Sequence, residues 1–212
     1  MSGEPGLRER KKQQTRREIA DTAEALFAER GFEHVTVAEV ARAANVSDKT
    51  VFNYFPTKED LFFDEYEAME TGLVRALTER DRRDSVLDAC RRFYAGGLSR
   101  MAQQEASGPL AAHAKILAAS PALQERQREI FHLQEQTLAR EVAAVAGADG
   151  DKLEPRVIAA AVIGVVRALQ ERGLAQLARG REPASPAALR DDLERAFDLL
   201  ANGLRDYGRG GA

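Results

Sequence analysis

The amino-acid sequence predicts an all-α protein in which a compact group of three N-terminal helices precedes a larger helical domain. Apolar residues recur at helical spacing along nearly the whole chain, and no segment shows the alternating pattern of a strand. Ser, Thr and Pro residues occur where these patterns begin, as expected at helix starts. The 212 residues can form a small domain joined to a larger one, with about nine helices in total.

The composition narrows the class of protein. Charged residues make up 31% and hydrophobic residues 44%, which is ordinary for a folded chain, and the formal net charge is −3. The single cysteine, Cys90, excludes an internal disulfide and fits inert packing in a reducing cytoplasm. No apolar run approaches the roughly 20 residues of a membrane span, and the polar N-terminus lacks a secretory signal. We therefore expect a cytoplasmic protein without a membrane partner.

The first expected helix runs from Thr15 to Arg30 and ends at Gly31, a residue suited to a helix C-cap. Its apolar residues form one stripe: Ile19, Ala23, Leu26 and Phe27. Residues 1–14 are expected to form a basic arm ahead of this helix. The cations around this arm are Arg8, Arg10, Lys11, Lys12, Arg16 and Arg17. The arm is either a solvated terminus or a phosphate-binding segment, and its charge alone does not decide which.

Two short helices and a tight turn follow. Thr36, with a glutamate three residues later, predicts a capping box, and Asn45 can end that helix in the left-handed conformation. Ser47 is placed to cap the next helix, and Thr57 begins another capping box. Three helix starts within about 25 residues predict tight, defined corners.

The helix that follows Ser47 has one polar face. With about 100° per residue, four polar side chains fall within an arc of roughly 140°. They are Lys49, Thr50, Asn53 and Tyr54. Val51 and Phe55 lie opposite with Phe52 on the flank, and both phenylalanines are expected in the core. Two short helices joined by a tight turn, the second with an outward polar face, predict a helix-turn-helix that enters a major groove about 12 Å wide.

Residues 13–61 closely resemble the DNA-binding domain of the TetR family of transcriptional regulators. The resemblance is carried by the segments VAEVARAANVS and FPTKEDL and by the aromatic helix between them, and it covers roughly a quarter of the chain. It implies a helix-turn-helix DNA-binding domain over residues 15–57 and an effector-binding and dimerisation domain over residues 58–208. Residues 209–212 are then expected to form a flexible tail.

The resemblance also implies which side chains contact double-stranded operator DNA. They are Thr36, Ser47, Asp48, Lys49, Thr50, Asn53, Tyr54 and Lys58. Thr36, Tyr54 and Lys58 would bind phosphates, and the basic arm would reach phosphates or the minor groove. Phe52 stands where many members have tyrosine, so one phosphate hydrogen bond is absent. Asp48 would either repel phosphate or accept a hydrogen bond from a cytosine amino group.

The larger domain is expected to contain longer helices. A stripe of apolar residues after Thr57 begins the first of them: Phe62, Tyr66, Met69 and Leu73. The other expected helices are Ser85–Gln104, Pro109–Ala119, Pro121–Ala146, Glu154–Ala178 and Ala187–Tyr207.

The resemblance places an unidentified, largely apolar small-molecule effector between the middle helices and a homodimer interface on the last two. The candidate ligand contacts are Phe93, Leu98, Met101, His113, Leu117, Phe131, Gln134 and Leu138. The candidate interface residues are Ala160, Gly164, Ala168, Leu193, Phe197, Leu200 and Leu204. The alternative for each ligand candidate is a core residue, and the alternative for the last two helices is an ordinary pair of core helices.

The function that the resemblance implies is a homodimeric transcriptional repressor that a small molecule releases from its operator. A transcriptional activator has the same fold, and a protein-interaction module without DNA binding is a different class. Charge reversal at Lys49 and Lys58 distinguishes the two DNA-binding regulators from the interaction module, because it abolishes DNA binding and leaves an interaction module unaffected. No catalytic motif, phosphate-binding loop or metal-ligand cluster is evident, so we expect no enzyme activity, cofactor or metal.

Overall fold

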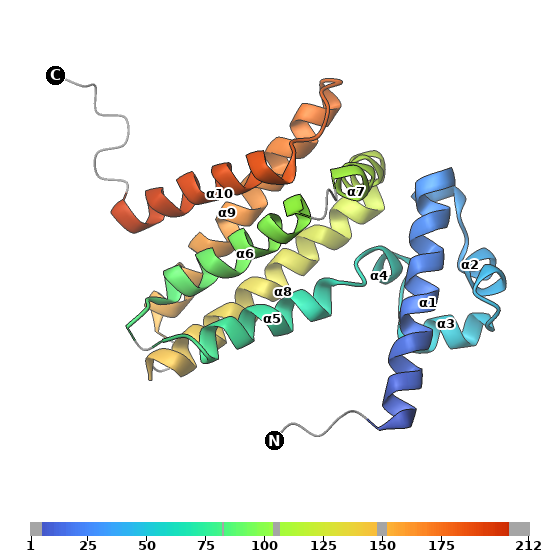
Figure 1. Cartoon of the computed structure of the whole chain (residues 1–212), viewed down its shortest axis with the longest axis horizontal. Helices are drawn as coiled ribbons and strands as arrows, with labels where there is room; N and C mark the ends of the chain where they lie inside the picture. Colours follow the sequence, from blue (N-terminus) through green and yellow to red (C-terminus); the bar gives the residue numbers. More distant parts are fainter. Residues whose placement is uncertain (1–5, 82, 104–106, 148–151, 204–212) are drawn as a thin grey trace.

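The computed structural model describes residues 6–81, 83–103, 107–147 and 152–203. Within these residues the fold is all-α, with ten α-helices, one short 3₁₀-helix and no strand (Figure 1). The helices are α1 (Leu7–Arg30), η1 (Phe32–His34), α2 (Val37–Ala43), α3 (Asp48–Tyr54), α4 (Lys58–Phe62), α5 (Tyr66–Thr78), α6 (Val86–Gln103), α7 (Ser107–Ala119), α8 (Pro121–Ala146), α9 (Leu153–Ala178) and α10 (Pro186–Asn202). Across the described ranges, none of these helices is long and apolar enough to span a membrane.

The predicted caps of the N-terminal helices are confirmed. The backbone N–H of Glu39 donates to Thr36 Oγ1, and the Glu39 carboxylate accepts from the Thr36 N–H at 2.8 Å, which completes the capping box. Asn45 has a φ of 56°, and Ser47 caps α3. These local bonds end α2 and begin α3 within four residues, and so define the angle between the two helices.

Three helix boundaries differ from the sequence-based prediction, and one of them is the end of α10, which lies at Asn202 instead of Tyr207. The first helix begins at Leu7 instead of Thr15, because the basic stretch is made of good helix formers and continues α1 without a cap. The stripe that follows Thr57 is divided between α4 and α5, which are separated by Phe63, Asp64 and Glu65. The described chain therefore has one more α-helix than expected.

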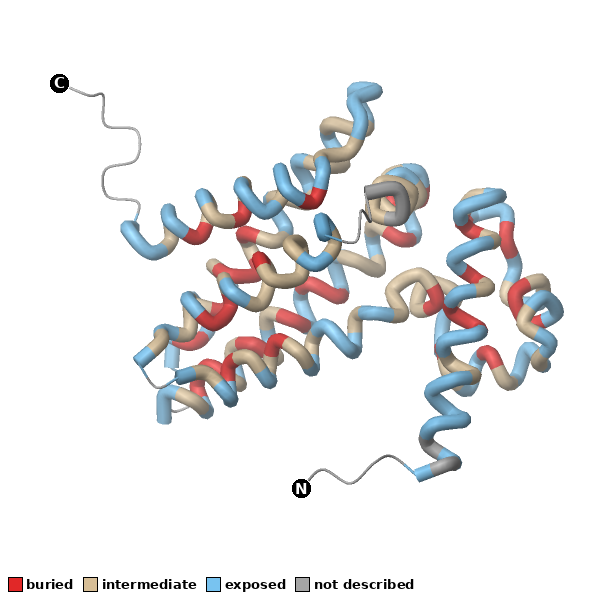
Figure 2. Tube along the Cα trace, in the orientation of Figure 1, coloured by how far each residue is buried: buried red, intermediate tan, exposed pale blue. Residues whose placement is uncertain are grey.

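The buried residues form two hydrophobic clusters (Figure 2). The larger cluster lies among α5, α6, α8, α9 and α10, with Leu77, Cys90, Val162 and Phe197 all completely buried. The smaller cluster, which we call the junction core, lies under the helix-turn-helix. Its members are Ile19, Ala20, Ala23, Phe27, Phe32, Val35, Val40, Ala41, Val51, Phe55, Leu61, Leu117 and Leu123.

The junction core joins the two parts of the chain. Leu117 of α7 and Leu123 of α8, which lie about 60 residues beyond the helix-turn-helix, are buried in it. Ser120 Oγ donates to Glu33 Oε1 of η1 at 2.5 Å. Arg126 of α8 forms an ion pair with Asp60 of α4 at 2.9 Å. The N-terminal helices therefore rest on α7 and α8 and not only on one another.

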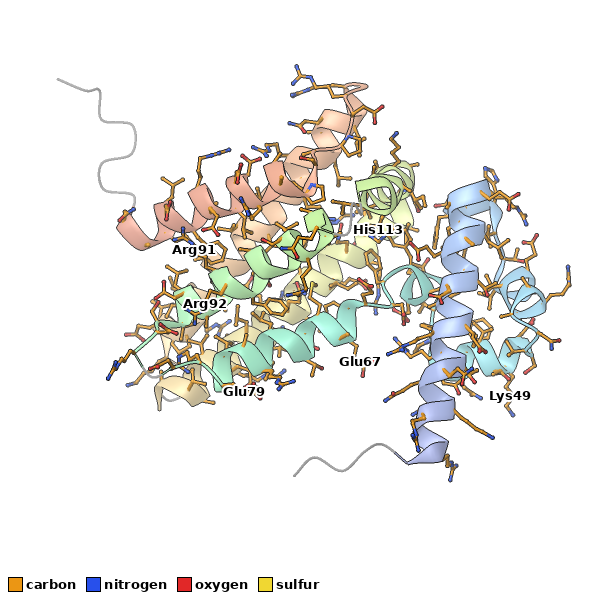
Figure 3. All side chains as sticks on the ribbon, in the orientation of Figure 1. Lys49, Glu67, Glu79, Arg91, Arg92 and His113 are labelled. Carbon is orange, nitrogen blue, oxygen red and sulfur yellow. The ribbon has the colours of Figure 1, made fainter. Side chains whose placement is uncertain are left out.

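His113 on α7 contributes an aromatic contact to this junction (Figure 3). Its imidazole stacks on the Phe62 ring, with centroids 4.0 Å apart and an interplanar angle of 19°. Burial lowers the pKa of His113 from its ordinary value of 6.5 to about 4. Between these two values the unfolded chain binds a proton that the folded chain does not, so stability falls as pH decreases from 6.5 towards 4.

We expect acidification to destabilise the wild-type protein through His113. Between about pH 7 and about pH 5 the wild-type free energy of unfolding should fall by up to about 2 kcal/mol more than that of His113→Phe, which retains a ring against Phe62. Urea unfolding at both pH values measures this difference. His132→Phe, at an exposed position on α8, serves as the matched control and should keep the wild-type pH dependence. Equal pH dependence in wild type and His113→Phe would contradict the assignment.

Candidate nucleic-acid interface and effector cavity

Helix α3 presents the polar face that its sequence predicts. Val51 and Phe55 are 1% exposed and anchor the helix in the junction core. Asp48, Lys49 and Asn53 are exposed, and Figure 3 shows Lys49 directed away from the body of the molecule. The other side chains of the α3 face are Ser47, Thr50 and Tyr54, of which Ser47 is exposed and the last two are half-buried. The helix thus offers donors and acceptors to a ligand that approaches from outside.

Phe52 corrects the expectation that both phenylalanines of this helix are core residues. Its side chain is 50% exposed, whereas Phe55 is buried as expected. With Val51 and Phe55 anchoring the helix, a residue on the flank of the wheel remains at the surface. The α3 surface therefore includes an aromatic ring of the kind that packs against a thymine methyl group.

Two of the predicted phosphate-binding side chains are engaged within the protein. Lys58 Nζ donates to the Phe32 carbonyl oxygen at 2.6 Å and lies 4.0 Å from the centroid of the Phe32 ring. Burial lowers the pKa of this ammonium group. The Thr36 hydroxyl donates to the Glu39 carboxylate at 2.8 Å. Both side chains stabilise the N-terminal fold: the Thr36 hydroxyl proton is already donated, and one of the three N–H groups of Lys58 is occupied.

Arg16 belongs to the basic arm in the sequence, but its guanidinium is directed into the structure. Nη1 donates to the Tyr54 carbonyl oxygen at 3.0 Å, at the end of α3. Nη2 lies 2.8 Å from Asp64 Oδ1, in the segment between α4 and α5, and the guanidinium also lies 4.5 Å from the Phe55 ring centroid. Burial raises the pKa of the Asp64 carboxyl despite the neighbouring guanidinium. Arg16 therefore connects α1, α3 and the α4–α5 segment, a positioning role that charge patterning alone did not reveal.

The remaining cations of the arm lie on the surface of α1 instead of ahead of it. They are Arg8, Arg10, Lys11, Lys12 and Arg17, and all are exposed. These cations therefore lie on the exposed surface of the N-terminal part of α1.

The candidate ligand contacts do not form one group. Leu117 lies in the junction core and His113 stacks on Phe62, so both contribute to the contact between domains. The larger cluster includes Phe131 and Leu138, with Phe93 and Leu98 packed against it. Gln134, on the same helix as Phe131, is only 4% exposed, and Met101 is half-buried near the end of α6.

A small cavity of about 10 Å³ lies among α5, α6 and α8. Its lining residues are Met69, Glu70, Leu73, Val74, Tyr94, Gln134, Thr137 and Leu138. Only Gln134 and Leu138 of the sequence-predicted contacts line it. The α5 residues were missed because their apolar spacing also fits a helix that faces only the core.

Cys90 is an inert core residue. Its side chain is completely buried, and burial raises the pKa of the thiol to about 12. In the described part of the chain, no group of three or more His, Cys, Asp and Glu side chains gathers where it could hold a metal ion.

Some of the predicted dimer-interface residues are buried within the single chain, and others lie at the surface. Leu193 and Phe197 are 2% and 0% exposed within the single chain and pack in the larger cluster, so in this conformation both side chains belong to the core of their own chain. Leu200 packs partly against the same cluster, and Leu204 lies outside the described residues. The α9 stripe remains at the surface, since Ala160 and Ala168 are exposed and Gly164 is half-buried with open space beside it. Exposed apolar residues accompany it, namely Leu153, Val157 and, on α10, Leu199.

A helix-turn-helix with an outward polar helix is joined in the same chain to a larger helical domain. This arrangement defines a class of DNA-binding transcriptional regulators. Comparison with known proteins identifies the family. Residues 19–64 match the family of bacterial regulatory proteins named tetR, and residues 84–205 match the MftR C-terminal domain. The chain belongs to the TetR family of transcriptional regulators.

Individual relatives support this assignment along the full chain. The regulator TcmR of Streptomyces glaucescens is 30% identical over 98% of this chain and 92% of its own. The putative mycofactocin biosynthesis regulator MftR of Mycobacterium tuberculosis is 26% identical over 92% of this chain and 93% of its own. The structure of NalD, a repressor of a multidrug efflux pump in Pseudomonas aeruginosa, has the same fold, with a TM-score of 0.55 over 93% of this chain and 100% of that one at 19% identity.

We expect Arg16→Ala to destabilise the protein by about 1–3 kcal/mol, because it removes the partner of a half-buried carboxylate and of the Tyr54 carbonyl. Thermal unfolding followed by circular dichroism measures the change. Arg17→Ala, at the adjacent exposed position, is the matched control and should stay within about 0.5 kcal/mol of wild type. An Arg16→Ala variant as stable as Arg17→Ala would show that the contacts of Arg16 do not position the helices.

Proposed function

We propose that this regulator is a homodimeric repressor that binds operator DNA through α3 and leaves it when a small molecule binds the larger domain. The observation that carries the proposal is the α3 face itself. Exposed Lys49 and Asn53 project from a helix whose opposite face is anchored by two completely buried residues. Because α3 is anchored on one face and polar on the other, its polar face is suited to recognition of an external partner.

The chemistry of the face fits DNA. Lysine and asparagine side chains pair with the exposed edges of guanine and adenine in the major groove, and the Tyr54 hydroxyl can donate to phosphate. The exposed ring of Phe52 adds an apolar contact suited to thymine or deoxyribose. Cations on α1 supply phosphate contacts beside the groove.

The α9 surface supports the dimer. A monomeric helix-turn-helix reads too few base pairs for selective binding, so two copies on paired half-sites are expected. Ala160, Gly164 and Ala168 form a surface of small residues that allows a second helix to approach closely, and Val157 is 54% exposed beside them. Apolar surface of this kind is stabilised when a second copy covers it.

Effector release follows as a shift between two conformations. A molecule that binds better to a dimer whose α3 helices no longer match the groove spacing of about 34–36 Å lowers operator occupancy. A preference of roughly 10⁴-fold moves the equilibrium from 1:99 to 99:1.

Activation of transcription would use the same DNA contacts, and a reporter gene with and without the regulator distinguishes repression from activation.

We expect Lys49→Glu to abolish selective operator binding while leaving the fold intact. The test uses the intergenic DNA upstream of the gene, or a site selected from a random library, with binding measured across a salt series. The wild-type log affinity should fall steeply with log salt, and the variant should lose more than tenfold in affinity for the selected site. Lys49 is preferable to Lys58 because Lys58 also holds the Phe32 carbonyl.

Arg83→Glu is the matched control, because it makes the same charge change at an exposed site between α5 and α6. It should bind like the wild type. If the wild type selects no sequence from the library, or if Lys49→Glu binds as tightly as the control, DNA recognition by α3 is excluded and the interaction-module alternative is favoured.

We expect Val157→Glu to convert the dimer to monomers and to weaken operator binding by more than tenfold, since it places two charges in an apolar interface. Analytical ultracentrifugation measures the mass. Leu133→Glu introduces the same charge at a 45% exposed leucine on α8 and should remain dimeric. A dimeric Val157→Glu variant would exclude the α9 surface as the interface.

A further inference from the structure

We propose that α3 reads two base pairs of each operator half-site, with both purines on one strand. Asp48 and Lys49 together read a G·C pair. Phe52 and Asn53, one helical turn further on, read an A·T pair. The inference rests on the proposed function, because it names the bases that the recognition helix selects. It is carried by the order of the side chains along α3, by their exposure and by the state of the Asp48 carboxylate.

The four side chains form two rows along α3. Lys49 and Asn53 are four residues apart, and so are Asp48 and Phe52, so the members of each row lie one above the other on the same side of the helix. The two rows are about 100° apart around the helix axis. All four residues are exposed, with Phe52 at 50%. A helix seated in the major groove therefore directs one row toward each strand.

The chemistry of one row matches purines, and that of the other row matches pyrimidines. Lys49 can donate to O6 and N7 of guanine, and the Asn53 amide can pair with N6 and N7 of adenine. The Asp48 carboxylate can accept from the N4 amino group of cytosine, and the Phe52 ring can pack on the methyl group of thymine. Every base pair has a purine opposite a pyrimidine, so the same two base pairs satisfy both rows.

The spacing along the helix axis assigns the side chains to base pairs. Asp48 and Lys49 differ in height by about 1.5 Å, which is less than the rise of about 3.4 Å between base pairs, so they face one pair. Phe52 and Asn53 face another pair for the same reason. The two levels are about 6 Å apart, which is about two base-pair steps. The half-site therefore contains a guanine and an adenine on one strand, about two positions apart.

The carboxylate of Asp48 is not engaged within the described part of the protein. Ser47 caps α3 by accepting from the Thr50 N–H at 3.1 Å, so the cap does not use Asp48. The carboxylates in the first turns of α2 and α4, Glu39 and Asp60, close capping boxes and pair with arginines. Asp48 forms no hydrogen bond or ion pair with a described residue. A carboxylate beside DNA phosphates opposes binding unless it accepts a hydrogen bond from a base, so its place on this helix favours readout of cytosine.

Selection from a random DNA library tests the motif and the part of Asp48 in it. Wild type should select a G·C pair and an A·T pair about two steps apart, with both purines on one strand. Asp48→Ala keeps the Ser47 cap and should reduce the preference for the G·C pair at its position by at least about fivefold, while the A·T preference remains. Asp191→Ala removes an exposed carboxylate from α10 and is the matched control, which should select the wild-type motif.

The same experiment separates base readout from an effect on the helix. A carboxylate at the first position of α3 also interacts favourably with the helix dipole. If that is the only role of Asp48, Asp48→Ala unfolds at a lower temperature than the wild type and still selects the wild-type motif with unchanged strength. This result would overturn the assignment of Asp48 to cytosine.

Removal of a single methyl group tests the contact of Phe52. Deoxyuridine in place of the selected thymine keeps the base pair and removes only the methyl group. It should weaken binding of the wild type about fourfold and leave the affinity of Phe52→Ala unchanged, because that variant has no ring to lose a contact. Deoxyuridine at a thymine outside the half-site is the control and should affect neither protein.

Three results would overturn the inference. They are a wild-type motif without the two purines on one strand, an Asp48→Ala variant that selects the wild-type motif with unchanged strength, and deoxyuridine that affects wild type and Phe52→Ala alike. Each of these leaves the proposed function intact, because the wild type has then selected a sequence. A wild type that selects no sequence excludes the proposed function and this inference with it.

Discussion

The packing of α4, the last turns of α7 and the first turns of α8 against the helix-turn-helix is the constraint on which the rest of the structure depends. Helices α2 and α3 have only seven residues each and cannot bury enough apolar surface to be stable alone. They gain a core because Phe27 and Phe32 pack with residues from beyond residue 60, including Leu117 and Leu123. The recognition helix is therefore held by the larger domain as well as by its own neighbours.

This shared core gives the regulator a physical basis for communication between its two functions. Ser120–Glu33 and Arg126–Asp60 bind α8 and its N-terminal cap to η1 and α4, and Arg16 binds the α4–α5 segment to α3. These contacts connect the larger domain to η1 and α4 and, through Arg16, to the end of α3. A tightly packed junction has few intermediate arrangements, so it favours a change between two discrete positions over gradual deformation.

Local signals in the sequence were sufficient for the helix-turn-helix but not for the sites that depend on distant contacts. The caps at Thr36 and Ser47 act within four residues, so spacing alone predicted them. The burial of Leu193 and the inward direction of Arg16 depend on partners far along the chain, which a single helical stripe or a count of charges does not reveal. Phe52 was misassigned for the same reason, because an aromatic residue on a short helix can lie on either side of the boundary between core and surface.

Hydrogen exchange in a Leu117→Ala variant tests most directly whether the larger domain holds the recognition helix. Truncation of this buried leucine costs about 2–5 kcal/mol, and we expect faster exchange of α2 and α3 amides as well as those of α7. Leu193→Ala makes an equivalent cavity in the other cluster, and it should accelerate exchange in α6 and α10 while leaving α3 protected. If Leu117→Ala alters only α7 and α8 and α3 exchanges as in the wild type, the helix-turn-helix is held independently of the larger domain.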